Sequence, residues 1–123
     1  MNTKACILYV DDEEINLRIF KDSFRRNYTV FTAISGVEAL NILSKEKIDV
    51  VITDQKMPEM TGVELLKEVN YKFPEIPPSR LILSGYIEDE DIQEAFESYK
   101  LSKFIPKPWE FEELKQIIKD VVE

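Results

Sequence analysis

Five short apolar runs alternate with five stretches of helical periodicity, and this alternation constrains the fold more than any other feature of the chain. The strand-like runs are residues 5–10, 28–33, 49–53, 80–84 and 103–105. The helical stretches are residues 14–26, one stretch opened by Ser35, another opened by Thr61, and residues 88–99 and 110–122. Parallel strands need crossover connections, so strict alternation predicts a doubly wound α/β fold with helices on both faces of a parallel sheet.

Local patterns refine this prediction. Two helix starts carry a capping-box pattern, Ser35 with Glu38 and Thr61 with Glu64. Residues 28–33 alternate between apolar and polar side chains, which predicts a strand near the edge of the sheet. Helical spacing predicts inward-facing side chains at Ile15, Ile19, Phe20, Phe24, Val37, Leu40, Leu43, Val63, Leu66, Val69, Ile92, Ala95, Phe96, Tyr99, Phe111, Leu114, Ile117, Ile118 and Val121.

Composition excludes several classes of function. With 24 acidic and 16 basic residues the chain has a formal charge of −8, which argues against nucleic acid as its main partner. The single Cys6 cannot form an internal disulfide, and its apolar neighbours predict a small buried side chain. The absence of histidine excludes Ser-His-Asp and Cys-His relays and any His-ligated metal.

The length of the chain, 123 residues, suggests one domain. No apolar run approaches the roughly 18 residues of a membrane span, so we expect a cytoplasmic protein.

Polar residues follow four of the five predicted strands at the point where each strand ends. Asp11 and Asp12 follow the first strand, Asp54 the third, Ser84 the fourth and Lys107 the fifth. In doubly wound sheets, ligands bind outside the carboxyl ends of the strands. We therefore expect these five side chains to line one polar cleft.

The chemistry of this set indicates phosphoryl transfer. Three clustered carboxylates repel one another and raise each other's pKa, and a bound Mg²⁺ or Mn²⁺ would remove that penalty because hard cations prefer oxygen ligands. Lys107 can pair with one phosphoryl oxygen and Ser84 can donate a hydrogen bond to another. A carboxylate nucleophile beside a metal and a lysine suits a phosphoryl-accepting site.

With these residues at these strand ends, the sequence resembles a response-regulator receiver domain of bacterial two-component signalling. The resemblance rests on four segments in order and covers essentially the whole chain, residues 1–123: Val10–Glu13, Asp54–Gly62, Leu83–Gly85 and Phe104–Pro108. Each segment alone is weak, but four in the right order are specific. The family implies a flavodoxin-like (βα)5 three-layer sandwich with strand order 2-1-3-4-5.

The resemblance also implies metal and acceptor roles. Asp54 would be the phosphoacceptor. Asp12 would bind Mg²⁺ directly, Asp11 largely through water, and the backbone carbonyl of Lys56 would complete the protein ligands. Lys107 would pair with the phosphoryl group, and the Lys107–Pro108 bond would be cis.

Switching and partners follow from the same resemblance. Ser84 would be the switch hydroxyl and Phe104 the aromatic that changes rotamer on phosphorylation. The phosphodonor would be a histidine kinase or a histidine phosphotransfer protein. The helix at 88–99, the strand at 103–105 and the last helix would form an output surface, for a C-terminal output domain or a homodimer. Beyond self-phosphorylation from a donor and self-dephosphorylation, we expect no enzymatic activity.

Other interpretations remain for the same residues. Asp11 to Glu14 could be acids favoured at a helix N-terminus, and the acidic run 87–91 is best interpreted as a solvated helix start. A degenerate receiver, used only for protein interaction or dimerisation, is the main functional alternative. A phosphatase with an aspartyl-phosphate intermediate is a third, but such enzymes usually place a second Asp two residues after the nucleophile, where this chain has Lys56.

Lys56 and Tyr86 depart from common patterns of the family. Both are expected to border the phosphoryl group. We hypothesise that they hinder the in-line approach of water and slow self-dephosphorylation.

Overall fold

The computed structural model describes residues 4–75, 77–85 and 90–122, in which strands and helices alternate as predicted. The strands are β1 Cys6–Val10, β2 Thr29–Ala33, β3 Val50–Asp54, β4 Ser79–Ser84 and β5 Lys103–Pro106. The helices are α1 Glu14–Phe24, α2 Gly36–Lys45, α3 Gly62–Lys72, α4 Glu90–Ser98 and α5 Phe111–Val122.

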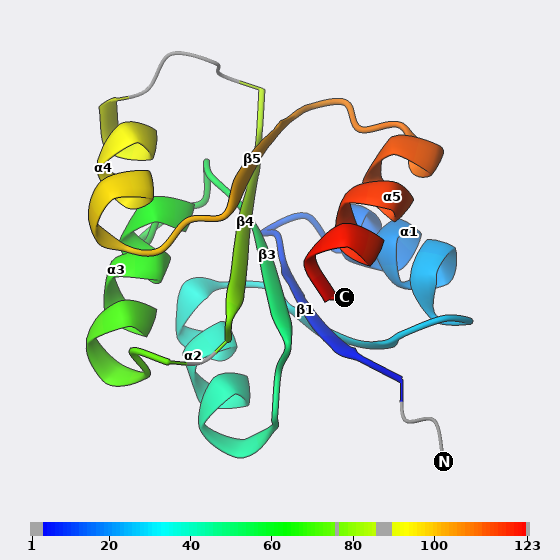
Figure 1. The fold of residues 1–123 in the computed structure, drawn as a ribbon, viewed down its shortest axis with the longest axis horizontal. Helices are drawn as coiled ribbons and strands as arrows, with labels where there is room; N and C mark the ends of the chain where they lie inside the picture. The colour runs from blue at the N-terminus through cyan, green and yellow to red at the C-terminus, as the bar shows by residue number, and fades with distance from the viewer. Residues whose placement is uncertain (1–3, 76, 86–89, 123) are drawn as a thin grey trace.

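All strand pairs are parallel, in the order β2-β1-β3-β4-β5, which confirms the predicted fold class and strand order. Helices α1 and α5 cover one face of the sheet, and α2, α3 and α4 cover the other (Figure 1). Each face has its own apolar cluster, one including Phe20 and Leu114 and the other including Leu66 and Ala95. Strand β2 lies at an edge, as its alternating sequence predicts.

The two predicted capping boxes differ in their hydrogen bonds. At α3, the Thr61 hydroxyl accepts from the Glu64 amide at 3.1 Å and the Glu64 carboxylate accepts from the Thr61 amide at 2.8 Å, so both halves form. At α2, the Ser35 hydroxyl accepts from the Glu38 amide at 3.1 Å, but the Glu38 carboxylate accepts from the Ile34 amide at 3.3 Å. Both helices therefore begin where the sequence predicts.

Several predicted core side chains are exposed instead. Ile15, Ile19 and Val37 are 57%, 49% and 66% exposed, and Phe96 and Phe111 are also exposed. In α1 the buried side chains are Leu17, Phe20 and Phe24. Periodicity fixes the spacing of an apolar stripe but not which of two adjacent stripes meets the sheet. Cys6 is half-buried rather than buried.

A fully buried arginine in β4 was not anticipated from the sequence. Arg80 is 0% exposed, and burial lowers the pKa of its guanidinium. It donates hydrogen bonds to the carbonyls of Phe73, Pro74, Pro77 and Tyr99 and to the side-chain oxygen of Asn70. Arg80 thus ties the end of α3 and the following loop to the end of α4.

Within the part of the chain that the structure describes, none of the helices combines the length and the apolar content that crossing a bilayer requires. Most of the acidic run 87–91 lies outside the described residues, so its predicted role as a solvated helix start stays a prediction.

Candidate functional site

The polar residues predicted at the strand ends gather at one edge of the sheet. Asp54 and Ser84 are the last residues of β3 and β4, Asp11 follows β1, and Lys107 follows β5. The register sets Asp54 beside Leu83 and Ser84 beside Pro106 on the neighbouring strands. Because parallel strands end at the same edge, residues far apart in sequence come within contact distance.

The Lys107 ammonium lies between two of the carboxylates. Its Nζ atom is 3.1 Å from Asp54 Oδ1 and 3.6 Å from Asp11 Oδ2. Asp11 is 0% exposed and Asp54 is 8% exposed, whereas the Lys107 side chain keeps 27% of its surface in solvent. Two buried carboxylates thus share one cation, which leaves the pocket with excess negative charge.

The pKa of Asp54 is raised above its usual value. Burial is the largest cause, and the charge of Asp11 adds to it, while Lys107 and a hydrogen bond from the Gln55 amide act in the opposite direction. The predicted mutual repulsion of the carboxylates is therefore present but second to desolvation. Either a proton or an additional cation at this pocket relieves the same penalty.

Three carboxylates form a cluster that fits a divalent cation. Asp11, Asp12 and Asp54 each offer one oxygen, and these oxygens lie within 4.8 Å of one another. An all-oxygen set with open sides suits Mg²⁺ or Mn²⁺, which retain several waters when bound to protein. The donor chemistry is thus consistent with a divalent metal site.

Two neighbours that sequence reasoning missed fix the Asp11 carboxylate. The Tyr9 hydroxyl donates to Asp11 Oδ2 at 2.9 Å, and the Asn16 amide donates to the same oxygen at 3.2 Å. Asp11 Oδ1 accepts from the Glu13 amide at 2.9 Å. Burial, and then the charge of Asp11, raise the pKa of the Tyr9 hydroxyl. The hydroxyl therefore stays protonated and can donate its hydrogen bond. A tyrosine among aliphatic residues just before Asp11 was the available signal for this role.

The loop after Asp54 is closed against the start of α3. The Gln55 side-chain oxygen accepts from the Val63 amide at 2.9 Å, and the Gln55 carbonyl accepts from the Gly62 amide at 3.0 Å. A Cβ atom at Gly62 would lie only 2.5 Å from the Asp54 backbone oxygen. Gly62 is therefore required for close approach, and Gln55 is a second positioning residue that the sequence did not reveal.

The other predicted site residues differ in their burial and in their contacts. Ser84 is buried, and its carbonyl accepts from the Lys107 amide at 2.9 Å. Phe104 is half-buried against the cluster beneath α2, α3 and α4, and Lys56 is exposed. The Lys107–Pro108 bond is cis, as the resemblance implied. Tyr86 lies outside the described residues.

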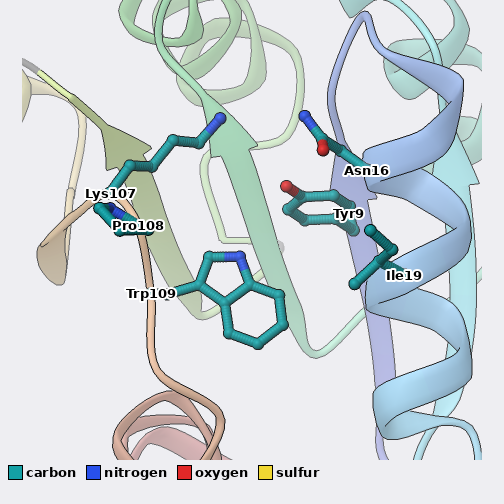
Figure 2. A pocket seen from close by; sticks show the side chains of 6 residues that line it. All are labelled: Tyr9, Asn16, Ile19, Lys107, Pro108 and Trp109. Atoms are coloured by element: carbon teal, nitrogen blue, oxygen red, sulfur yellow. The ribbon is translucent and has the colours of Figure 1, made fainter.

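A cleft of about 540 Å³ opens beside the acidic pocket. Figure 2 shows the polar ends of Lys107 and Asn16 approaching from opposite sides, with the Tyr9 hydroxyl between them and Trp109 below. Trp109 packs edge-on to Phe20, with ring centroids 6.3 Å apart. The cleft gives solvent and larger molecules access to the Lys107 side of the pocket.

Comparison with known proteins agrees with this geometry. Residues 7–119 match the family described as the response regulator receiver domain. The chain is 36% identical over 121 residues to sporulation initiation phosphotransferase F of Bacillus subtilis, covering 97% of this chain and 93% of that protein. It is 35% identical over 120 residues to the hydrogenase transcriptional regulatory protein HoxA of Cupriavidus necator, covering 98% of this chain but only 24% of HoxA.

Solved structures show the same fold. The chemotaxis protein CheY4 of Vibrio cholerae superimposes with a TM-score of 0.88 at 30% identity, with 97% of this chain and 99% of that chain covered. The non-phosphorylated HemR receiver domain of Leptospira biflexa gives a TM-score of 0.86 at 26% identity, with coverages of 98% and 95%.

Proposed function

The chain belongs to the response regulator receiver family, and from that premise we propose that it accepts a phosphoryl group on the Asp54 carboxylate. The receiver domain would comprise residues 1–123, in a cytoplasmic protein. The observation that carries the proposal is the position of Asp54 at the floor of the acidic pocket, with the Lys107 ammonium 3.1 Å away. Receiver domains pair with histidine kinases or phosphotransferases, so we infer a phosphohistidine donor.

The transfer is a displacement at phosphorus. An oxygen of the ionised Asp54 carboxylate forms the new O–P bond, the N–P bond of the donor breaks, and the histidine nitrogen leaves with the bonding pair. Lys107 pairs with one phosphoryl oxygen, and the buried Ser84 hydroxyl donates to another. Tyr9 and Asn16 act indirectly, because they hold Asp11 in place.

Asp12 and Asp54 would hold Mg²⁺ directly, with Asp11 acting largely through water and the Lys56 carbonyl completing the set. The bound ion would neutralise negative charge on the carboxylates and on the transferring group. The Asp54 carboxylate must be ionised to attack, whereas its raised pKa favours the protonated form. A bound cation would favour the ionised form.

We infer that phosphorylation shifts a two-state equilibrium. The new group adds about −1.5 to −2 charges, which draws Lys107 and Ser84 toward it. The hydrogen bond from the Lys107 amide to the Ser84 carbonyl joins the ends of β5 and β4, so movement at one is passed to the other. Phe104 then turns inward, and the α4-β5-α5 surface changes for an output domain or a second copy.

The transfer itself can be tested with a phosphorylated histidine phosphotransfer protein as donor. With the phosphoryl group of the donor labelled, wild type should take up the label in Mg²⁺ and Asp54→Asn should not. The control Asp22→Asn, which changes an exposed acid on α1, should behave as wild type. Label retained in Asp54→Asn would refute the proposal. Absence of label in wild type would favour the degenerate-receiver interpretation.

We further propose that Lys56 and Tyr86 slow self-dephosphorylation by hindering the approach of water. The half-life of the phosphorylated protein should shorten in Lys56→Asn and in Tyr86→Ala. Half-lives that are unchanged or longer in both variants would exclude this role.

A further inference from the structure

A basic groove of about 660 Å³ lies between the end of α1 and the length of α5. It begins at the turn after α1, and Figure 1 shows these two helices side by side on one face of the sheet. The turn after α1 leads into the start of β2, where the Thr29 amide donates to the Ala5 carbonyl just before β1, so this turn lies at the edge of the sheet opposite the acidic pocket. Neither Lys107 nor the three clustered carboxylates lines this groove, so it is separate from the acidic pocket.

Four cations line the groove on a chain whose formal charge is −8. Arg25 and Arg26 follow α1, and Lys115 and Lys119 lie one turn apart on α5; all four are exposed. The lining contains one carboxylate, Asp22. None of the ion pairs found among residues 4–75, 77–85 and 90–122 involves these four cations. With four cations and one carboxylate in its lining, the groove carries a local excess of positive charge.

The groove also has an apolar floor. Phe111 is 39% exposed, and its ring stacks on the buried Phe24 ring with centroids 5.3 Å apart and planes 25° apart. The Lys115 ammonium lies 5.9 Å from the centre of the Phe111 ring. Exposed aromatic surface beside cations is suited to a ligand that carries both an apolar group and negative charge.

The shape of the groove favours a segment of polypeptide. The α5 wall runs from Phe111 to Val122, which at 1.5 Å per residue is about 17 Å. An extended chain covers that length with about five residues. We propose that this groove binds a short acidic segment of a partner protein, with an apolar side chain on Phe111 and carboxylates on the four cations.

A nucleic acid is the less favoured occupant. Its affinity depends on many phosphate contacts along a strongly charged backbone, and the net charge of this chain repels a polyanion beyond the groove. A short acidic peptide also supplies an apolar side chain for the exposed Phe111 ring, which a nucleic-acid backbone lacks.

Nuclear magnetic resonance titration of the whole chain tests the proposal. The probe is an end-capped peptide Glu-Glu-Phe-Glu-Glu-Leu-Glu-Glu, and its counterpart has Gln in place of every Glu. The acidic peptide should shift amide signals of Arg26, Phe111, Lys115 and Lys119. Binding should weaken as NaCl is raised from 50 to 500 mM, because salt screens exposed charges.

The variant Lys115→Glu/Lys119→Glu should lose at least about tenfold in affinity, as expected when attractive charges become repulsive. The control Lys67→Glu/Lys45→Glu makes the same change in net charge at an exposed position of α3 and in the last turn of α2, and it should bind as wild type. Urea unfolding and uptake of phosphoryl groups from acetyl phosphate check that both double variants remain folded.

Three results would overturn the proposal. The first is the absence of shifts, or shifts that lie away from the groove. The second is equal binding by the Gln peptide or by the Lys115→Glu/Lys119→Glu variant. The third is tighter binding of an eight-residue oligothymidylate at the same signals, which would identify the groove as a nucleic-acid site. Because uptake of phosphoryl groups is measured separately, failure here leaves the phosphoacceptor proposal intact.

Discussion

Substitution of Gly62 by alanine should impair the site although Gly62 contributes no side chain to it. Gly62 begins α3, directly after the loop that closes on Asp54. The added Cβ would lie 2.5 Å from the Asp54 carbonyl oxygen and 3.1 Å from the Gln55 side-chain oxygen. Alanine ordinarily favours a helix over glycine by up to about 1 kcal/mol, so the sign of the effect depends on this clash.

The magnitude follows from the distance. Ordinary contact begins at 3.4 Å, so the Asp54 carbonyl or the start of α3 must move by roughly 0.9 Å. Overpacking of this kind costs about 1–3 kcal/mol of unfolding free energy. A displacement near 1 Å at a reacting group can cost up to about 100-fold in rate. We expect phosphoryl uptake from acetyl phosphate to slow by about 10- to 100-fold.

The other two glycines provide matched controls. At Gly36 the added Cβ would meet only the Met60 side chain, whose flexible thioether can move aside. At Gly85 no atom lies within 4 Å of the added Cβ among the described parts of the chain. Both alanine variants should keep wild-type rates and stability within about 1 kcal/mol. A Gly62→Ala variant with wild-type rate and stability would refute this account of the loop.

Three further predictions concern stability. Arg80→Met should lower the unfolding free energy by about 3 kcal/mol in urea titration, because one buried and several partly buried carbonyls lose their donor; a loss below about 0.5 kcal/mol would contradict this. Since burial raises the pKa of Asp54, the folded protein binds the proton more tightly than the unfolded chain. In EDTA, wild type should therefore lose stability relative to Asp54→Asn as pH rises from about 4 through the raised pKa, and parallel pH profiles would exclude the effect. Addition of 10 mM Mg²⁺ should raise the Tm of wild type but not of Asp12→Ala, and equal shifts in both would place the metal elsewhere.

The fold and the composition of the site could be predicted because both depend on patterns that are visible in the sequence itself. Alternation of strand and helix periods requires a parallel sheet, and a parallel sheet brings Asp11, Asp54 and Lys107 to one edge whatever the details of packing. The capping box at Thr61 was predicted correctly for a similar reason, because both of its hydrogen bonds join residues within one four-residue segment.

What could not be predicted depends on tertiary contacts. The spacing of Ile15 and Ile19 is that of a buried stripe, yet the adjacent stripe through Leu17 meets the sheet. Arg80 appeared as an ordinary residue at the start of a strand, because its carbonyl partners come from separate segments. The role of Gly62 depends on a single interatomic distance, which no sequence pattern encodes.

Intact-mass spectrometry after incubation with acetyl phosphate tests the central claim most directly. Wild type in Mg²⁺ should gain the mass of one phosphoryl group, the adduct should be absent in EDTA, and Asp54→Ala should show none. Proteolytic mapping should place the adduct on the peptide that contains Asp54. An adduct that persists in Asp54→Ala, or that forms equally without Mg²⁺, would contradict the assignment of Asp54 as the phosphoacceptor in a metal-assisted pocket.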